Sequence, residues 1–229
     1  MSLQRLSGIM SIHYRNKVLW LYVFGGILLG NFLVNYIVSR LTGGVEIYTG
    51  GMASIFVCLF IGGIFTAAQT FPFALGFSVR RTDYYNGTLL MFTGVSVLTA
   101  LLILLLSLLE VGTGNWGTNL HFFHLPYVTD GSILAQFMIY FSLLLYNLFA
   151  GFVIGSFQRK FGGKGTFILM VVLFLILTIL ALFCTANGWW GAIFSWIAGH
   201  TALQLAIWLF PLTLIFAASS YFLLRRASA

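Results

Sequence analysis

The stretch Thr88–Leu109 reads TLLMFTGVSVLTALLILLLSLL and contains no charged residue. About 20 apolar residues in helical form cross the ~30 Å hydrocarbon core of a bilayer. Arg80 and Arg81 precede the stretch and Glu110 follows it. Because basic residues are retained on the cytoplasmic side during insertion, this stretch predicts a transmembrane helix whose N-terminal end faces the cytoplasm.

Five further stretches have the same character, and all six are continuous apolar runs rather than the alternating segments of a β-barrel. Of all residues, 60% are hydrophobic and 7% are charged, whereas soluble domains have about 25% charged residues. The sequence therefore predicts one all-α integral membrane domain over residues 1–229, without a separate soluble domain. The expected spans are 18–38, 52–77, 88–109, 133–157, 166–184 and 202–224.

The positions of the Lys and Arg residues predict the orientation. Those expected in the cytoplasm are Arg5, Arg15, Lys17, Arg80, Arg81, Arg159, Lys160, Lys164, Arg225 and Arg226. Only Arg40 falls on the other side. We therefore expect six spans with both termini inside the bacterial cytoplasmic membrane. The net charge of +7 is then explained by topology anchors that face anionic lipid or a cytoplasmic partner, not by nucleic-acid binding.

Residues 1–17 fit an amphipathic helix that lies in the cytoplasmic interface before the first span. At 100° per residue, one side carries Leu3, Leu6, Ile9, Met10 and Tyr14, and the other carries Gln4, Ser7, Ser11 and Arg15. The alternative is a frayed basic tail, because the segment is short.

Motifs for chemistry are scarce. Residues 162–166 read GGKGT, which lacks the Gly-Lys-Ser/Thr order of a phosphate-binding loop. We therefore expect no ATP site and no enzymatic activity in this chain. His121 and His124 would need a third ligand such as Asp130 to hold a metal, and Ser195 with His200 lacks an acid partner. We expect neither a metal site nor a catalytic site.

The two cysteines, Cys58 and Cys184, fall within apolar spans, where we expect small buried side chains rather than a disulfide or a metal pair.

The spans contain no carboxylate away from their ends, so the buried charge typical of ion-coupled carriers is not indicated. Their neutral polar residues either bond between helices or line a translocation path. The candidates for the path are Asn31, Asn35, Gln69, Asn147 and Gln204. The pairs Gly26/Gly30 and Gly151/Gly155 have a spacing that permits close helix packing, within the chain or between two copies.

The two longer outer segments, 111–132 and 185–201, are rich in Gly, Asn, Trp and His. Their tryptophans fit an aromatic belt at the level of the lipid headgroups. These are Trp116, Trp189, Trp190 and Trp196.

The segment Phe71–Gly87 reads FPFALGFSVRRTDYYNG. Pro72 is expected to kink the inner end of the second span and Gly76 to turn the chain. Ser78 or Thr82 can cap a short helix that has Asp83 near its positive end. With Arg80, Arg81 and the pair Tyr84-Tyr85, this predicts a compact docking knob of charged and aromatic side chains. The alternative explanation for the two arginines is the positive-inside rule alone.

This segment resembles a motif between the second and third spans of the membrane subunits of type-2 ABC exporters. The resemblance extends to an interfacial helix, six spans and the lack of a fused ATPase. It implies that the segment is a coupling helix seated in a separate cytosolic ABC ATPase, which binds ATP and Mg²⁺. The implied coupling residues are Ser78, Arg80, Arg81, Thr82, Asp83 and Tyr84; Arg5, Arg15 and Lys17 would lie on the elbow helix.

The same resemblance implies two membrane subunits, as a homodimer or a paired permease, and a re-entrant segment at 185–201. The apolar wall, with 24 Phe in the chain, favours export of amphipathic peptides, including antimicrobial ones, or lipid-like compounds. Two alternatives stay open. One is an ATP-independent secondary carrier or channel, and the other is a membrane enzyme or sensor partner that depends on His121, His124 or His200.

Overall fold

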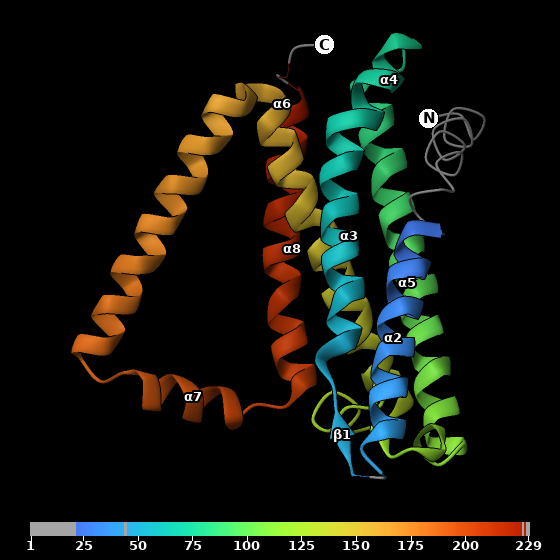
Figure 1. Ribbon diagram of the computed structural model, residues 1–229. Helices are drawn as coiled ribbons and strands as arrows, with labels where there is room; N and C mark the ends of the chain where they lie inside the picture. Colours follow the sequence, from blue (N-terminus) through green and yellow to red (C-terminus); the bar gives the residue numbers. More distant parts are fainter. Residues whose placement is uncertain (1–21, 44, 226, 228–229) are drawn as a thin grey trace.

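The computed structural model describes residues 22–43, 45–225 and 227. Over these residues the chain forms long helices packed side by side, with two short strands and a crosswise helix at one end (Figure 1). The elements are α2 (Phe24–Leu41), β1 (Ile47–Tyr48), the 3₁₀ helix η2 (Gly50–Met52), α3 (Ala53–Phe65), the π-helix η3 (Thr66–Thr70), α4 (Phe71–Gly76), α5 (Arg81–Gly112), the 3₁₀ helix η4 (Asn115–Gly117), β2 (Leu120–His121), α6 (Ile133–Ala186), α7 (Trp190–Ala198) and α8 (Ala202–Arg225). The expected interfacial helix at 1–17, with Arg5, Arg15 and Lys17, lies outside the described residues.

Five helical segments are long and apolar enough to cross a membrane, so the described chain is mainly helical and fits the predicted membrane class. They are Phe24–Leu41, Gly50–Gly76, Arg81–Gly112, Ile133–Ala186 and Ala202–Arg225. The second segment is continuous through η2, α3, η3 and α4. The third begins at Arg81, so most of the expected loop 78–87 belongs to the first turns of α5.

The fourth and fifth expected spans both lie in α6, which has 54 residues. The prediction of a loop from Gln158 to Gly165 is wrong, because helix continues up to and immediately after one residue, Gly162 (φ 71°, ψ −178°). Glycine adopts a positive φ without the steric cost of a Cβ. At this corner α6 divides into two arms that diverge and run toward the same end of the molecule (Figure 1).

Glycine brings α3 and the first arm of α6 into backbone contact. A Cβ on Gly151 would lie 1.8 Å from the carbonyl oxygen of Phe60, and one on Gly155 would lie 2.6 Å from that of Ile64. From the other helix, a Cβ on Gly63 would lie 2.2 Å from the carbonyl oxygen of Leu148. Gly151/Gly155 therefore serves packing within the chain. In contrast, no atom lies within 4 Å of a Cβ built on Gly26 or Gly30.

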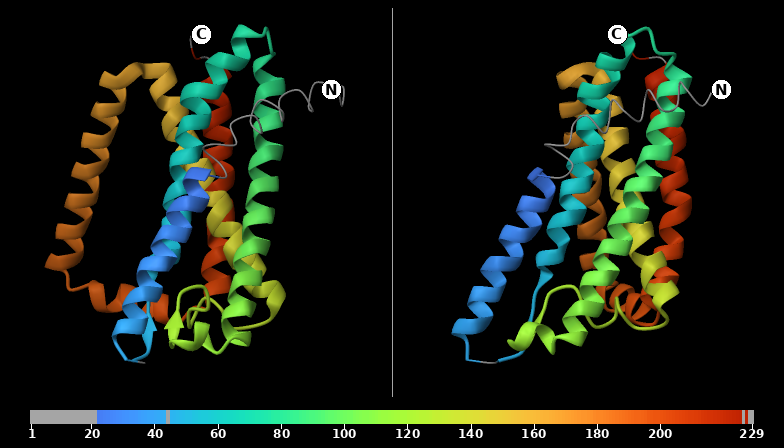
Figure 2. Two further views of the ribbon diagram at one scale, coloured as in Figure 1. Left: turned by 45° about the vertical axis from the view of Figure 1, so that its right-hand side comes forward. Right: turned by 90° about the vertical axis from the view of Figure 1, so that its right-hand side faces the viewer.

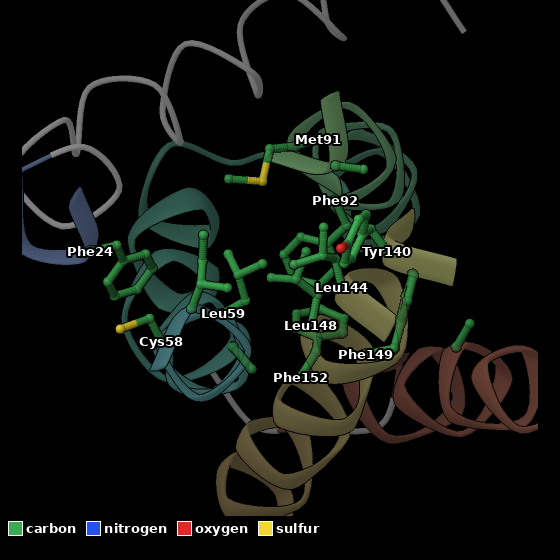
Figure 3. Packing of buried hydrophobic residues seen from close by; sticks show 14 of the residues in the cluster. Phe24, Cys58, Leu59, Met91, Phe92, Tyr140, Leu144, Leu148, Phe149 and Phe152 are labelled. Atoms are coloured by element: carbon green, nitrogen blue, oxygen red, sulfur yellow. The ribbon is translucent and has the colours of Figure 1, made fainter. Parts of the chain in front are cut away.

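Aromatic rings fill the space between α5 and α6. Phe92 is fully buried and makes edge-to-face contacts with Phe149 and Phe152, each with 5.3 Å between ring centroids. Figure 3 shows this group beside Tyr140, Leu144 and Leu148 of α6, with Leu59 of α3 reaching toward it. The core therefore lies where α3, α5 and the first arm of α6 meet.

The second arm of α6 stands apart from this core. It leaves the corner at Gly162 and rejoins the bundle only through α7 and α8 (Figures 1 and 2). None of the described residues from Gly163 to Ala186 is buried. Its side chains are almost all apolar, so this arm is suited to contact with lipid or with another apolar surface.

We expect Gly151→Ala to destabilise the bundle by about 1–3 kcal/mol, because its methyl group would overlap the Phe60 carbonyl and force α3 and α6 apart. Gly26→Ala is the matched control, since space is open there, and its stability should be unchanged or slightly higher. Thermal unfolding of both variants in lipid nanodiscs, followed by circular dichroism, measures the difference. Equal stabilities would contradict the close contact between α3 and α6.

Candidate functional site

A left-handed residue ends α4 and turns the chain toward α5. Ser78 has a φ of 56°, its N–H donates to the Leu75 carbonyl (2.9 Å), and the Val79 N–H donates to the Ala74 carbonyl (3.3 Å). These two bonds form a Schellman motif, which closes the helix by satisfying its last carbonyls. The expected turn is therefore made at Ser78 and not at Gly76.

The segment after this turn is not a separate short helix. Arg80 occupies the N-cap of α5 with extended backbone and makes no side-chain capping bond. Neither Ser78 nor Thr82 caps a helix as predicted, because α5 begins between them and continues for 32 residues. Asp83 does lie in the first turn, where its charge favours the helix dipole. We call residues 77–83 the α4–α5 turn.

The side chains of the α4–α5 turn differ in exposure from the tyrosines that follow. Ser78, Arg80 and Thr82 are exposed, and Arg81 and Asp83 are partly exposed. Tyr84 is 0% exposed and Tyr85 is 8% exposed. The predicted docking knob is therefore corrected: its polar residues are accessible, whereas its aromatic pair lies inside the bundle. The reason is that Tyr84 and Tyr85 already belong to α5 and occupy its packed side.

Tyr84 is hydrogen-bonded to the second membrane-spanning segment. Its hydroxyl donates to the Thr66 carbonyl (2.9 Å) and lies 2.9 Å from the Thr70 hydroxyl, and its ring packs edge-on against Phe71. Thr66 and Thr70 are the ends of the π-helix η3, in which the Phe71 N–H also donates to the Thr66 carbonyl. The expected irregularity at Pro72 is thus a π turn directly before it. Proline cannot donate and crowds the preceding turn, which favours such a widening.

Tyr85 and Arg81 connect the start of α5 to α8 by hydrogen bonds. The Tyr85 hydroxyl donates to the Ala217 carbonyl (2.7 Å), and one Arg81 guanidinium nitrogen donates to the Arg225 carbonyl (2.8 Å). The Tyr85 ring also contacts Tyr221 edge-on. The first turn of α5 therefore holds η3 on one side and α8 on the other.

Basic side chains collect at this end of the bundle, which we call the basic end. The α4–α5 turn, the corner of α6 and the end of α8 lie there together (Figures 1 and 2). Its described basic residues are Arg80, Arg81, Arg159, Lys160, Lys164 and Arg225, and Asp83 is its acidic residue. Arg40, Glu46, Glu110 and Asp130 belong to the opposite end. The charge separation inferred from the sequence is thus present in space.

The five polar residues considered for a translocation path do not converge. Asn31 donates to the Gly51 carbonyl (3.0 Å) and so joins α2 to η2, while Asn35 donates to Asn31. Asn147 donates to the carbonyl of Leu143 in its own helix, and Gln204 accepts from the Thr201 N–H at the start of α8. Gln69 is exposed on η3. Four of the five residues thus have hydrogen-bond partners within the described chain, and apart from the Asn35–Asn31 bond none of these bonds joins two of them.

Sequence reasoning missed the most highly bonded carboxylate of the described chain. Glu110 is 0% exposed at the end of α5. Its oxygens accept from the backbone N–H groups of Phe122 (3.1 Å), Phe123 (2.8 Å) and His124 (3.0 Å) and from the Trp116 indole (2.9 Å). We call residues 113–132, which fold around it, the cap. Hydrogen bonds of this kind satisfy a buried charge, so Glu110 has a structural role.

The histidines of the cap point to separate partners. His121 stacks on Tyr48 (4.4 Å between ring centroids), and His124 Nδ1 lies 3.2 Å from the Ser107 hydroxyl. Asp130 accepts from the Tyr127 N–H, away from both rings. Partial desolvation and, second, the Glu46 carboxylate raise the pKa of the Tyr48 phenol. Among the described residues no three potential metal ligands come together.

Ser195 and His200 are not paired either. The Ser195 hydroxyl donates to the Ala192 carbonyl (3.0 Å), and His200 Nδ1 lies 2.7 Å from the Trp196 carbonyl. The helix α7 (Trp190–Ala198), which contains Ser195 and ends just before His200, lies across the ends of the second arm of α6 and α8 (Figure 1). It does not turn back between the spans as a re-entrant segment would.

The two cysteines are free; Cys58 is buried as expected, whereas Cys184 on the second arm of α6 is partly exposed. Of the tryptophans, Trp116 belongs to the cap through its bond to Glu110. Trp189, Trp190 and Trp196 are exposed on or beside α7, and a shallow apolar pocket is lined by Trp189, Ala192, Ile193 and Trp196.

Comparisons with known proteins show no relative. No protein-family model, curated protein or solved structure matches the chain. The candidate site therefore stands on its geometry: an accessible charged turn that buried hydrogen bonds connect to two membrane-spanning segments.

We expect Glu110→Ala to destabilise the protein by about 3 kcal/mol or more, because several buried N–H groups would lose their acceptor. The loss of stability in Glu110→Gln should be smaller than in Glu110→Ala, since the amide keeps one oxygen that can accept hydrogen bonds. Glu46→Ala is the control at an exposed acidic residue of the same end and should change stability by less than about 0.5 kcal/mol. Chemical unfolding in detergent measures all three. A Glu110→Ala protein as stable as the control would contradict the structural role.

Proposed function

We propose that this chain is the membrane-spanning permease subunit of an ATP-binding cassette exporter. In this proposal a separate cytosolic ATPase binds ATP and Mg²⁺ and docks on the α4–α5 turn, and the permease works as a homodimer or with a paired permease. The observation that carries the proposal is the form of this turn. Its accessible surface holds Arg80, Thr82 and Asp83, while the two following tyrosines are hydrogen-bonded inside the bundle. A partner that moves this turn would pull on two membrane segments at once.

The proposal includes a six-span topology with both termini in the cytoplasm of a bacterial cell. Each arm of α6 exceeds the ~20 residues that cross a bilayer, so in this proposal the reversal at Gly162 divides one helix into two spans. The basic end would then face the cytoplasm, where basic residues are retained. The acidic cap and α7 would face outward.

The cargo that fits this chain best is an amphipathic peptide or a lipid-like compound. The described spans expose mainly apolar side chains, and the buried carboxylate Glu110 is fully engaged by the cap. A route for small ions would need charged or polar groups in the membrane interior. Export of antimicrobial peptides is the specific form of the proposal.

The orientation predicts which positions react with a membrane-impermeant maleimide. In a background with Cys58→Ala and Cys184→Ala, Thr82→Cys should react only from the cytoplasmic side and Asn187→Cys only from outside. Both native side chains are exposed, so access depends on the side of the membrane alone. Intact cells compared with inside-out vesicles provide the measurement. Reaction of both positions from the same side would contradict the six-span topology.

The docking proposal predicts that Asp83→Arg weakens binding of the cytosolic ABC ATPase by about tenfold or more, because it places a like charge next to Arg80 and Arg81. Glu46→Arg, the same kind of charge reversal at an exposed acidic residue of the opposite end, is the control and should bind normally. Co-purification and ATP hydrolysis in nanodiscs measure the effect. If wild type binds no ATPase but still transports, the ATP-independent carrier replaces the permease.

A further inference from the structure

Tyr84 and Tyr85, at the start of α5, donate hydrogen bonds to helices of different types. Tyr85 donates to a carbonyl of α8, whose helix continues regularly through that point. Tyr84 donates to the Thr66 carbonyl, which begins the π turn. The Tyr84 bond therefore acts on the π turn within the second membrane-spanning segment.

This π turn has an alternative close in structure. In η3 the Thr66 carbonyl accepts from the Phe71 N–H, five residues later, whereas in an α-helix it would accept from residue 70. The Tyr84 hydroxyl provides a further donor to the same oxygen, and the Thr70 hydroxyl lies within hydrogen-bonding distance of both. Short π turns inside α-helices are frequent at functional sites. Replacing one pattern by the other would rotate α4 relative to α3.

We propose that the Tyr84 hydroxyl is a latch that selects the π form of residues 66–70, so that displacement of the α4–α5 turn switches α4 between two rotational settings. The latch consists of the Tyr84 hydroxyl, the Thr70 hydroxyl and the Thr66 carbonyl. Tyr85 lies on the opposite side of the first turn of α5 and keeps α8 attached in both settings. The hydrogen-bonded connection is independent of the transport proposal, but the identity of the ATPase as the partner that moves the turn rests on it.

The latch predicts that removing one oxygen atom changes the setting of α4. A spin label at Phe73→Cys reports on α4, where the native side chain is 55% exposed, and a label at Leu98→Cys on α5, 70% exposed, is the reference position. Both are made in the Cys58→Ala, Cys184→Ala background in lipid nanodiscs. Tyr84→Phe should raise the population of a second spectral component at residue 73 roughly fivefold, the factor expected for one neutral hydrogen bond, and leave residue 98 unchanged.

Two further tyrosines provide matched controls. Tyr85→Phe removes the bond to α8 and should leave the label at residue 73 unchanged. Tyr146→Phe changes a tyrosine of α6 that packs on Phe216 and should have no effect at either position. An unchanged spectrum at residue 73 in Tyr84→Phe, or an equal change in Tyr146→Phe, overturns the latch. If Tyr84→Phe does not fold, Thr70→Val, which removes the hydroxyl in contact with both Tyr84 and the Thr66 carbonyl, should raise the second component at residue 73 by a smaller factor, and an unchanged spectrum there overturns the latch.

The same samples separate the latch from the proposed function. With the ATPase added, Tyr84→Phe should still form the complex, because the accessible residues of the turn are unchanged, and should lose stimulation of ATP hydrolysis by the permease. Failure of wild type to bind the ATPase rejects the exporter and leaves the label result to decide the latch. If wild type binds the ATPase but the spectrum of the label at residue 73 is unchanged in Tyr84→Phe, the latch is rejected and the exporter proposal stands.

Discussion

The structure depends on one constraint of the lipid environment: polar groups in the hydrocarbon region must find their partners within the protein. Most buried polar side chains of the described chain follow it, and the Ser96 hydroxyl in the middle of α5 is an exception that has no hydrogen-bond partner. Tyr84 and Tyr85 donate to carbonyls of neighbouring helices, and the Glu110 carboxylate collects several N–H groups. Hydroxyls such as those of Ser142 and Ser156 donate back to their own helix. Each bond between elements therefore also fixes how two elements lie relative to each other.

Close packing decides which helices join the core. Lipid chains are as apolar as leucine, so association between spans depends on close contact rather than on the hydrophobic effect. Gly63, Gly151 and Gly155 allow α3 and the first arm of α6 to touch backbone to backbone, and rings fill the space beside them. The second arm of α6 has bulky apolar side chains on all sides and remains apart. It can be covered equally well by lipid or by a protein surface of matching shape.

The sequence predicted the long apolar helices and the gathering of basic residues at one end of the bundle, because length, hydropathy and basic residues carry that information locally. No indication of a residue's role came from the sequence where that role depends on partners far away along the chain. Glu110 looked like the boundary of a span, since the N–H groups that surround it come from residues that only folding brings near. Tyr84 looked accessible because the helix was expected to begin near residue 88. Extended back to Arg81, the helical period places Tyr84 on the same buried side as Thr88 and Met91. For the π turn, Pro72 was the one local indication.

The two ends of α5 differ in what they hold. At one end, Glu110 of α5 accepts hydrogen bonds from the cap. Ser39 of α2 and Tyr140 of α6 also donate to the cap, to the carbonyls of Thr118 and Phe123 respectively. At the basic end the first turn of α5 binds η3 and α8. The 32-residue helix α5 thus connects the cap, which several hydrogen bonds hold in place, to the α4–α5 turn, which has an accessible surface. If force enters at the basic end, as the permease proposal requires, the cap is the fixed point about which α5 tilts, and the largest displacement falls at the tyrosines.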